Sequence, residues 1–280
     1  MPTNQVFHLD TPLGKGLVAL FKQLEDRLSL NEPINVYLAG GMAVHLYTAD
    51  RVTTDVDAEF GGRVFLPNDL IVDVALEDGS RESLYFDTNY NSTFALMHED
   101  YLDDAISLDV GLNKIKLHVL SPLDLAVSKI ARLADNDKED ISRLVRLKLT
   151  TADAIEQRAT AALVGYVGGL SMLRLNLRDA VNLAREVEVS ASVAEMKDAL
   201  HGGGFVITEN SGEQDRLYVG QIVAVTSMHA AQDIGRHQVV VHDLRSLDTK
   251  PAVGDRLDIK FKGGHGTVLA MGLSNKGLGR

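Results

Sequence analysis

The chain has 280 residues, of which 45% are hydrophobic and 24% charged, and this composition excludes a disordered or fibrous protein. Cysteine is absent, so disulfides, thiolate zinc sites and cysteine nucleophiles are excluded. No run approaches the roughly 18 apolar residues of a membrane span, and no secretory signal is visible. We therefore expect a cytoplasmic protein that has no membrane partner.

The net charge of −11 is unevenly distributed along the chain. Residues 1–150 carry 24 acidic and 14 basic side chains, whereas residues 201–280 carry 8 and 9. The change coincides with His201-Gly202-Gly203-Gly204, the clearest break in the sequence. We predict a domain over 1–150, a helical extension over 151–200, a β domain over 204–272 and a flexible tail over 273–280.

The first domain begins with an amphipathic helix, because Leu17, Leu20, Phe21, Leu24 and Leu28 recur at helical spacing. The elements expected after it are a buried strand over 34–39, a helix over 42–47, a strand over 54–60, a hairpin of 70–75 with 83–87, and a strand over 115–120. Asp78-Gly79 marks the turn of that hairpin.

The second half of the chain changes from helical to strand patterns. Ser121-Pro122-Leu123-Asp124 predicts a helix start, and the helix is expected to continue through Lys129 to Leu133. Residues 152–200 are rich in Ala, Leu, Arg and Glu, which is typical of helices. From Phe205 onward, short alternating segments separated by turn residues predict a small antiparallel, barrel-like β domain.

The residues that suggest chemistry lie between Val36 and Phe60. Gly40-Gly41 stand between a strand and a helix, where backbone N–H groups can approach an anion closely. Asp55 and Asp57 are two residues apart on the next predicted strand, so their carboxylates point to one face and favour a shared cation such as Mg²⁺. An anion-binding turn beside a carboxylate pair is typical of phosphoryl or nucleotidyl transfer.

This arrangement resembles the polymerase-β-like nucleotidyltransferase superfamily, and within it the AbiEii-type branch of toxins and abortive-infection proteins. The resemblance covers roughly residues 30–150, and it implies an α/β (α+β) fold in which a mixed β-sheet is flanked by a helical layer. The segment LYFD offers Asp87 as a third carboxylate, and Asp109 in ISLDVGL is a rival for that place. The later segment VLSPLDLAVSKIARLADNDKEDI offers Lys129, Asp137 and Asp140.

The resemblance also implies roles for these residues. Asp55, Asp57 and Asp87 would be catalytic and would hold two Mg²⁺ ions, with Asp140 or Asp137 assisting as a base or orienting the acceptor. The nucleotide-binding residues would be Gly40, Gly41, Thr54, Lys129 and Asp137. In-line attack by an acceptor hydroxyl on the α-phosphorus of an NTP would release pyrophosphate.

Each of these residues also has a purely structural interpretation. Asp55 and Asp57 can be solvated carboxylates of a strand, and Lys129 a solvated helix lysine. Asp137 can be a helix N-cap with Asp140 three residues later.

Residues 218–268 resemble the KfrB-type domain of plasmid and conjugative-transfer proteins. The residues that carry this resemblance include Tyr218, Gly220, Ile222, Gln232, Gly235-Arg236, His242-Asp243, Val253-Gly254, Ile259 and Gly266. The resemblance implies a mobile-element setting, in which Gln232, Arg236 and His242 would contact a nucleic acid or a protein.

We therefore predict a Mg²⁺-dependent nucleotidyltransferase that moves an NMP from an NTP to a hydroxyl of an RNA, such as a tRNA, or of a protein. Its expected role is that of a toxin or defence factor on a mobile element, with a cognate antitoxin as partner. The alternatives are a non-catalytic regulator with the same fold and a plasmid maintenance or transfer protein that acts by binding.

Overall fold

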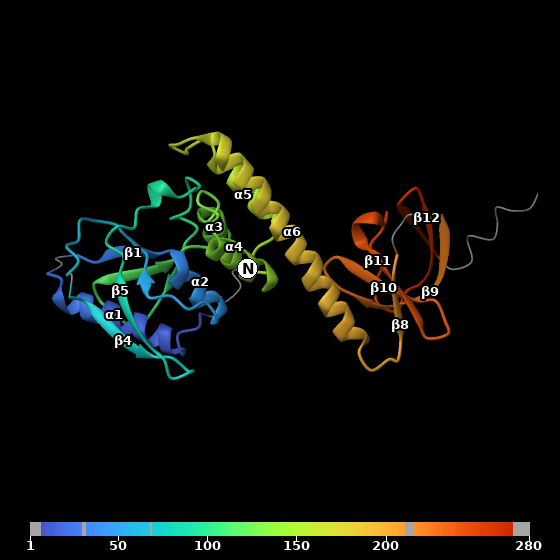
Figure 1. Cartoon of the computed structure of the whole chain (residues 1–280), viewed down its shortest axis with the longest axis horizontal. Helices are drawn as coiled ribbons and strands as arrows, with labels where there is room; N and C mark the ends of the chain where they lie inside the picture. Colours follow the sequence, from blue (N-terminus) through green and yellow to red (C-terminus); the bar gives the residue numbers. More distant parts are fainter. Residues whose placement is uncertain (1–6, 30–31, 68, 211–214, 271–280) are drawn as a thin grey trace, which may run out of the picture. The chain divides into compact units, whose positions relative to one another are not determined.

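The computed structural model describes residues 7–29, 32–67, 69–210 and 215–270 (Figure 1). The chain forms two compact units, which divide between Arg185 and Glu186, inside helix α6 (Leu170–Leu200). The expected tail over 273–280 lies outside the described residues. Within those residues, no helix combines the length and the apolar character needed to cross a membrane.

The first unit contains a mixed four-stranded sheet, as the sequence predicts. Its strand order is β3-β1-β7-β6, and β1 runs parallel to β7 and antiparallel to β3. The strands are β1 (Ile34–Leu38), β3 (Ala58–Phe60), β6 (Ile106–Leu108) and β7 (Ile115–Val119). The alternating buried residues of β1 and β7 place this sheet in the core.

A second sheet of three strands has the order β2-β5-β4. Its strands are β2 (Asp55–Val56), β4 (Ile71–Ala75) and β5 (Arg81–Phe86), and the predicted hairpin turns at Gly79, whose φ of +84° suits glycine. The prediction of one strand over 54–60 was wrong. The chain leaves this sheet after Val56 and joins the four-stranded sheet at Ala58, because its two halves pair with different partners, β5 and β1.

Helices cover these sheets. Helix α1 (Pro12–Arg27) is capped by Thr11, whose side chain accepts from Gly14 N, and it packs against β4 and β5. Helix α2 (Gly40–Thr48) follows β1 directly (Figure 1), and it is almost fully buried because its residues are nearly all apolar.

The predicted helix over 122–133 is shorter than expected. Helix α3 (Pro122–Ser128) starts as predicted, with Ser121 Oγ accepting from Asp124 N, but it ends before Lys129. Leu133 adopts a positive φ of +48°, which no α-helix tolerates. A new helix, α4 (Asp135–Arg146), starts just after it, followed by α5 (Ala152–Ala162) and α6, which confirm the helical reading of 152–200.

The second unit is built on a six-stranded sheet with the order β13-β12-β9-β10-β11-β8. Its strands are β8 (Val206–Glu209), β9 (Arg216–Val225), β10 (His229–Asp233), β11 (Gln238–Asp243), β12 (Arg256–Lys262) and β13 (His265–Ala270). Neighbouring strands are antiparallel except β8, which runs parallel to β11. The described strands form an open sheet rather than the barrel that we expected, because β13 and β8 stand at opposite ends of the order.

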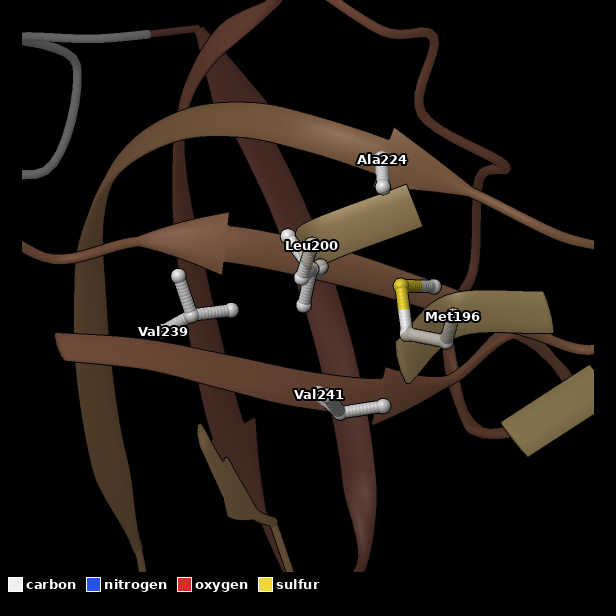
Figure 2. Packing of buried hydrophobic residues seen from close by; sticks show 6 residues of the cluster. Met196, Leu200, Ala224, Val239 and Val241 are labelled. Carbon is white, nitrogen blue, oxygen red and sulfur yellow. The ribbon is translucent and has the colours of Figure 1, made fainter. Parts of the chain in front are cut away.

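The end of α6 contributes to the hydrophobic core of this unit (Figure 2). Met196 and Leu200 lie one helical turn apart and pack against Ala224, Val239 and Val241 of the sheet. The packed unit therefore includes a helix segment that precedes the predicted β domain.

A polar network lies inside the sheet, and it corrects one expectation. Gln232 and His242 are 0% exposed, so they cannot contact a nucleic acid or a protein partner. His242 Nε2 lies 3.1 Å from Gln232 Oε1, and His242 Nδ1 lies 3.3 Å from Asn210 Nδ2. Gln232 Nε2 also donates to the carbonyl of Leu257, and Tyr218 Oη donates to Asn210. These bonds all form when His242 is neutral with its proton on Nε2.

We expect this network to make the second unit acid-sensitive. Burial lowers the pKa of His242 to about 4, below its value of 6.5 in an unfolded chain. Neutral His242 therefore makes its full contribution to the free energy of unfolding above pH 6.5. This contribution is lost as the pH falls toward 4, which lowers the free energy of unfolding by roughly 3 kcal/mol. Urea denaturation at pH 7.5 and 5.0 tests this: His242→Gln should lose much of the pH dependence and keep the part due to His229, whose pKa burial also lowers, and exposed His265→Gln should keep all of it. Equal pH dependence in the two variants would contradict the assignment.

Candidate functional site

The site forms where β1 ends and α2 begins. Gly40 has a φ of +61°, and a Cβ there would lie 1.7 Å from Asp57 Oδ2, so only glycine allows this approach. The backbone carbonyl of Asp57 accepts a hydrogen bond of 2.9 Å from Ala39 N. These contacts hold the Asp57 carboxylate against the first residue of the helix.

The break between β2 and β3 brings three carboxylates to one cleft. Asp55 lies in β2 opposite Tyr85, Asp57 occupies the break, and Asp87 follows β5 with its N–H bonded to the carbonyl of Val56. All three line a cleft of about 310 Å³. Thr53 Oγ1 donates to Asp55 Oδ1 over 2.5 Å, which fixes one carboxylate oxygen.

The neighbouring carboxylates affect the pKa of Asp57. Burial, together with the charges of Asp55 and Asp87, raises the pKa of Asp57 to about 6, while Lys129 and Arg132 oppose the shift. A carboxylate in this position is costly to ionise unless a cation joins it. The cleft therefore favours the binding of added positive charge.

The lining of the cleft also includes three basic residues, Arg51, Lys129 and Arg132. Lys129 Nζ lies 3.1 Å from Asp140 Oδ2 and 3.8 Å from Asp137 Oδ1. Arg132 makes a bidentate pair with Asp137, at 2.7 and 2.8 Å, and Arg51 Nε lies 2.9 Å from Asp140 Oδ1. Asp137 and Asp140 are buried, so they fix the cations in place from behind.

The structure brings most of the predicted site residues together. Those that line the cleft are Gly40, Gly41, Asp55, Asp57, Asp87, Lys129 and Asp137. Thr54 does not line it, and its carbonyl accepts from Tyr85 N. Asp140 is 0% exposed and lies behind the cations, and Asp109 lies outside the cleft lining.

The N-cap interpretation of Asp137 was wrong in its position. The N-cap of α4 is Ala134, and Asp137 stands at N3, where its Oδ2 accepts from Ala134 N over 2.9 Å. Burial would raise the pKa of Asp137, but hydrogen bonds from Arg132 and the charge of Lys129 outweigh it and hold the pKa below its ordinary value. Asp137 therefore caps the helix and holds the cations at once.

Sequence reasoning missed several residues of the cleft. Arg132 lies on the turn between α3 and α4, and Phe94 ends the short helix η1 (Ser92–Phe94). Phe94 lines the cleft although it is 79% exposed, so it contributes little to the core. No motif marks either residue, because both come to the cleft through tertiary structure.

The donor atoms suit a divalent cation of the Mg²⁺ type without forming a complete cage. In the described part of the chain, no three acidic, histidine or cysteine side chains are arranged as a ready-made metal site. Mg²⁺ generally uses one or two carboxylates, several waters and the phosphates of the substrate, so a complete protein cage is not needed. Burial and the charges of Asp55 and Asp87 raise the pKa of Asp57, and a bound cation would offset that cost of ionising it, which agrees with this fit.

Comparison with known families gives two matches. Residues 15–177, more than half of the chain, match the family described as "Nucleotidyltransferase of unknown function (DUF6036)". Residues 217–270 match the family described as "KfrB Domain". No curated protein and no solved structure matches the chain. The first match spans the whole cleft, and the second spans most of the six-stranded sheet.

Proposed function

The chain belongs to the DUF6036 family of nucleotidyltransferases of unknown function, and on this premise we propose that it transfers an NMP from an NTP to a hydroxyl of an RNA or a protein. The observation that carries the proposal is the cleft itself, whose lining combines three carboxylates with cations held by ion pairs, beside the start of α2. A triphosphate with a divalent cation has the charge pattern that matches these two sets of charges.

The proposal assigns a different role to each group of residues in the cleft. The N–H groups at the start of α2, together with Lys129 and Arg132, bind the phosphates. Asp55, Asp57 and Asp87 hold Mg²⁺, which supplies positive charge to the triphosphate and lowers the pKa of the acceptor hydroxyl. Asp140 and Asp137 are positioning residues, because they act through the cations that they hold.

Binding and pyrophosphate release test the proposal. We expect the purified protein to bind an NTP only when Mg²⁺ is present, by calorimetry, and to release pyrophosphate when cell extract supplies an acceptor. Transfer of label from the α-position, and not from the γ-position, identifies nucleotidyl transfer. Transfer from the γ-position would show phosphoryl transfer instead and would overturn the proposal.

Lys129→Ala is expected to weaken binding of the triphosphate. Lys129 is 8% exposed and lines the cleft, so its loss removes a held charge from the cleft. We expect the KM for the NTP to rise about tenfold or more. Lys138→Ala removes an exposed lysine of α4 and serves as the control. An unchanged KM in Lys129→Ala would mean that Lys129 has only a structural role.

Phe94→Ala is expected to weaken binding of the base. An exposed ring at the edge of the cleft can stack on a nucleobase, which contributes about 1–3 kcal/mol. The KM for the NTP should rise about tenfold without a change in melting temperature, and Phe94→Tyr should retain binding. Phe65→Ala, which removes another exposed phenylalanine outside the cleft lining, is the matched control. The same KM in Phe94→Ala and Phe65→Ala would remove Phe94 from the site.

The wider role that we propose is that of a toxin or defence factor of a mobile element, with an antitoxin as partner. It rests on the AbiEii-like order of motifs and on the KfrB domain, matched over 217–270. Induced expression of the full chain should arrest bacterial growth, and the Asp55→Asn/Asp57→Asn variant should not. Equal arrest by both would point to an action of the protein that does not need the cleft.

A further inference from the structure

Two further hollows adjoin the cleft along the segment after β5. A second hollow of about 360 Å³ shares Asp87, Tyr90 and Asn91 with the cleft. A third, of about 200 Å³, shares Ser92 and Thr93 with the second. We call the second and third hollows together the acceptor groove. Residues 87–97 therefore form a wall that runs from the carboxylates of the cleft along the whole groove.

The chemistry of the acceptor groove differs from that of the cleft. Neither of its hollows is lined by a lysine or an arginine among the residues that the structure describes, whereas the cleft has three. Its charged lining residues are Glu59 and Asp87. Its other lining groups are hydroxyls, amides, aromatic rings and apolar side chains such as Val167, which is 90% exposed. The groove is thus acidic and partly apolar.

The rim of the groove is acidic as well. Tyr101 Oη donates to Glu59 Oε2 over 2.7 Å and so ties the segment 98–104 to the groove. That segment carries Glu99, Asp100, Asp103 and Asp104. Arg158 pairs with Asp104 at 2.6 Å, and His98 lies 3.7 Å from Asp100, so two of these acids have a basic neighbour. Among the residues named here, acidic side chains outnumber basic ones.

This charge separates the two acceptor classes of the proposed function. RNA brings a phosphate with every nucleotide, and proteins bind it mainly through lysine and arginine. A polypeptide brings no backbone charge, and its basic side chains are attracted by an acidic groove. Exposed apolar and aromatic groups in the groove also suit a peptide chain.

Building on the proposed function, we propose that the acceptor is a polypeptide whose Ser, Thr or Tyr hydroxyl enters the groove and whose flanking residues are basic. The hydroxyl oxygen forms a bond to the α-phosphorus of the NTP. The bond from that phosphorus to the β-phosphate oxygen breaks, and pyrophosphate leaves. The hydroxyl proton is released to water at the junction of the cleft and the groove, where Asp87 lines both. The product is a nucleotide joined to the side chain by a phosphodiester.

A competition experiment tests the acceptor class. The full chain is incubated with each α-³²P-labelled NTP, Mg²⁺, total RNA and two hydroxyl-containing peptide libraries, one with basic flanks and one with acidic flanks. We expect label on the peptides, about tenfold more on the basic set than on the acidic set. Label on RNA alone would overturn the acceptor assignment and leave the proposed function standing. NTP binding without any labelled acceptor would also overturn the assignment, whereas the absence of NTP binding would overturn the proposed function itself.

Two variants link the acceptor to the groove. Thr88 lines the second hollow but not the cleft, so Thr88→Trp should reduce the kcat/KM for the peptide at least about tenfold while the affinity for the NTP stays unchanged. Thr160→Trp, at an exposed position of α5, controls for the added ring.

Glu59→Lys should reduce the preference for basic flanks, and exposed Glu77→Lys should not. Unchanged peptide transfer in both Thr88→Trp and Glu59→Lys would overturn the assignment.

Discussion

Replacing Asp55 and Asp57 together by asparagine is expected to abolish transfer and, at the same time, to make the metal-free protein more stable. Loss of two carboxylates from the metal-binding part of the cleft should reduce the transfer rate at least about a thousandfold. The gain in stability arises because burial and the neighbouring acids raise the pKa of Asp57 to about 6. A catalytic residue that costs stability is expected where function has shaped the site.

The sign of the pH dependence follows from the same shift. An unfolded Asp has a pKa of 3.8, so the folded carboxyl holds its proton more tightly. The protonated Asp57 carboxyl makes its full contribution to the free energy of unfolding below pH 3.8. This contribution is lost as the pH rises through about 6, which lowers the free energy of unfolding by up to roughly 3 kcal/mol. At pH 7.5 the double variant should therefore melt several degrees above the wild type, and near pH 3.5 the difference should vanish.

Melting curves with and without Mg²⁺ and NTP make this prediction specific. The ligands should raise the melting temperature of the wild type and leave that of the double variant unchanged. Glu32→Gln with Glu77→Gln removes two exposed charges and controls for net charge. A double variant that is less stable than the wild type at pH 7.5, or that is still stabilised by the ligands, would contradict the account of the carboxylates.

Asp140→Ala is expected to have the largest effect on stability of any single change at the site. Asp140 is 0% exposed, and it lies within 3.5 Å of basic groups of Arg51, Lys129 and Arg143. Its removal leaves Arg51 and Arg143 without their buried partner and leaves Lys129 with Asp137 alone, at 3.8 Å. The loss of a partner costs about 3–5 kcal/mol in comparable buried pairs. The transition of the first unit in chemical denaturation, followed by circular dichroism, should shift accordingly.

Asp135→Ala is the matched control for this change. Asp135 lies on the same helix, but its side chain is 96% exposed, and its pair with Lys138 is a surface pair of little energetic value. We expect a change within about 0.5 kcal/mol for this variant. Equal stability of the Asp140→Ala and Asp135→Ala variants would show that Asp140 does not hold the cations together.

The sequence was sufficient to predict the elements whose positions depend on neighbouring residues in the chain. The strand before Gly40, the helix after it and the turn at Gly79 follow from apolar runs and from glycine at positive φ. The break at Asp57 could not be predicted, because the residues of 54–60 alternate without interruption. Pairing with two different sheets decides where that strand ends.

The end of α3 is a second feature that the sequence could not predict. Residues 125–133 contain several good helix formers, so nothing local favours a stop. The turn after Ser128 places Arg132 within reach of Asp137, a tertiary pairing that helix propensity does not reveal. The cationic part of the cleft lining depends on that turn.

Buried polar residues were misread for a related reason. Gln232 and His242 were interpreted as contacts to a partner because they belong to the residues that carry the resemblance to the KfrB-type domain. They satisfy each other's hydrogen bonds inside the sheet, together with Asn210, and a sequence does not show such mutual satisfaction. Strand β10 was missed in the same region, because its residues His229–Asp233 include no β-branched side chain.

The most direct test of the central claim is transfer of label from α-³²P NTPs in the presence of Mg²⁺ and cell extract, by the wild type and by the Asp55→Asn/Asp57→Asn variant. The account predicts label on a macromolecule with the wild type and none with the double variant, although that variant is folded and at least as stable. Equal labelling by both proteins, or no labelling by a folded wild type with every NTP, would contradict the claim that this cleft is a nucleotidyltransferase site.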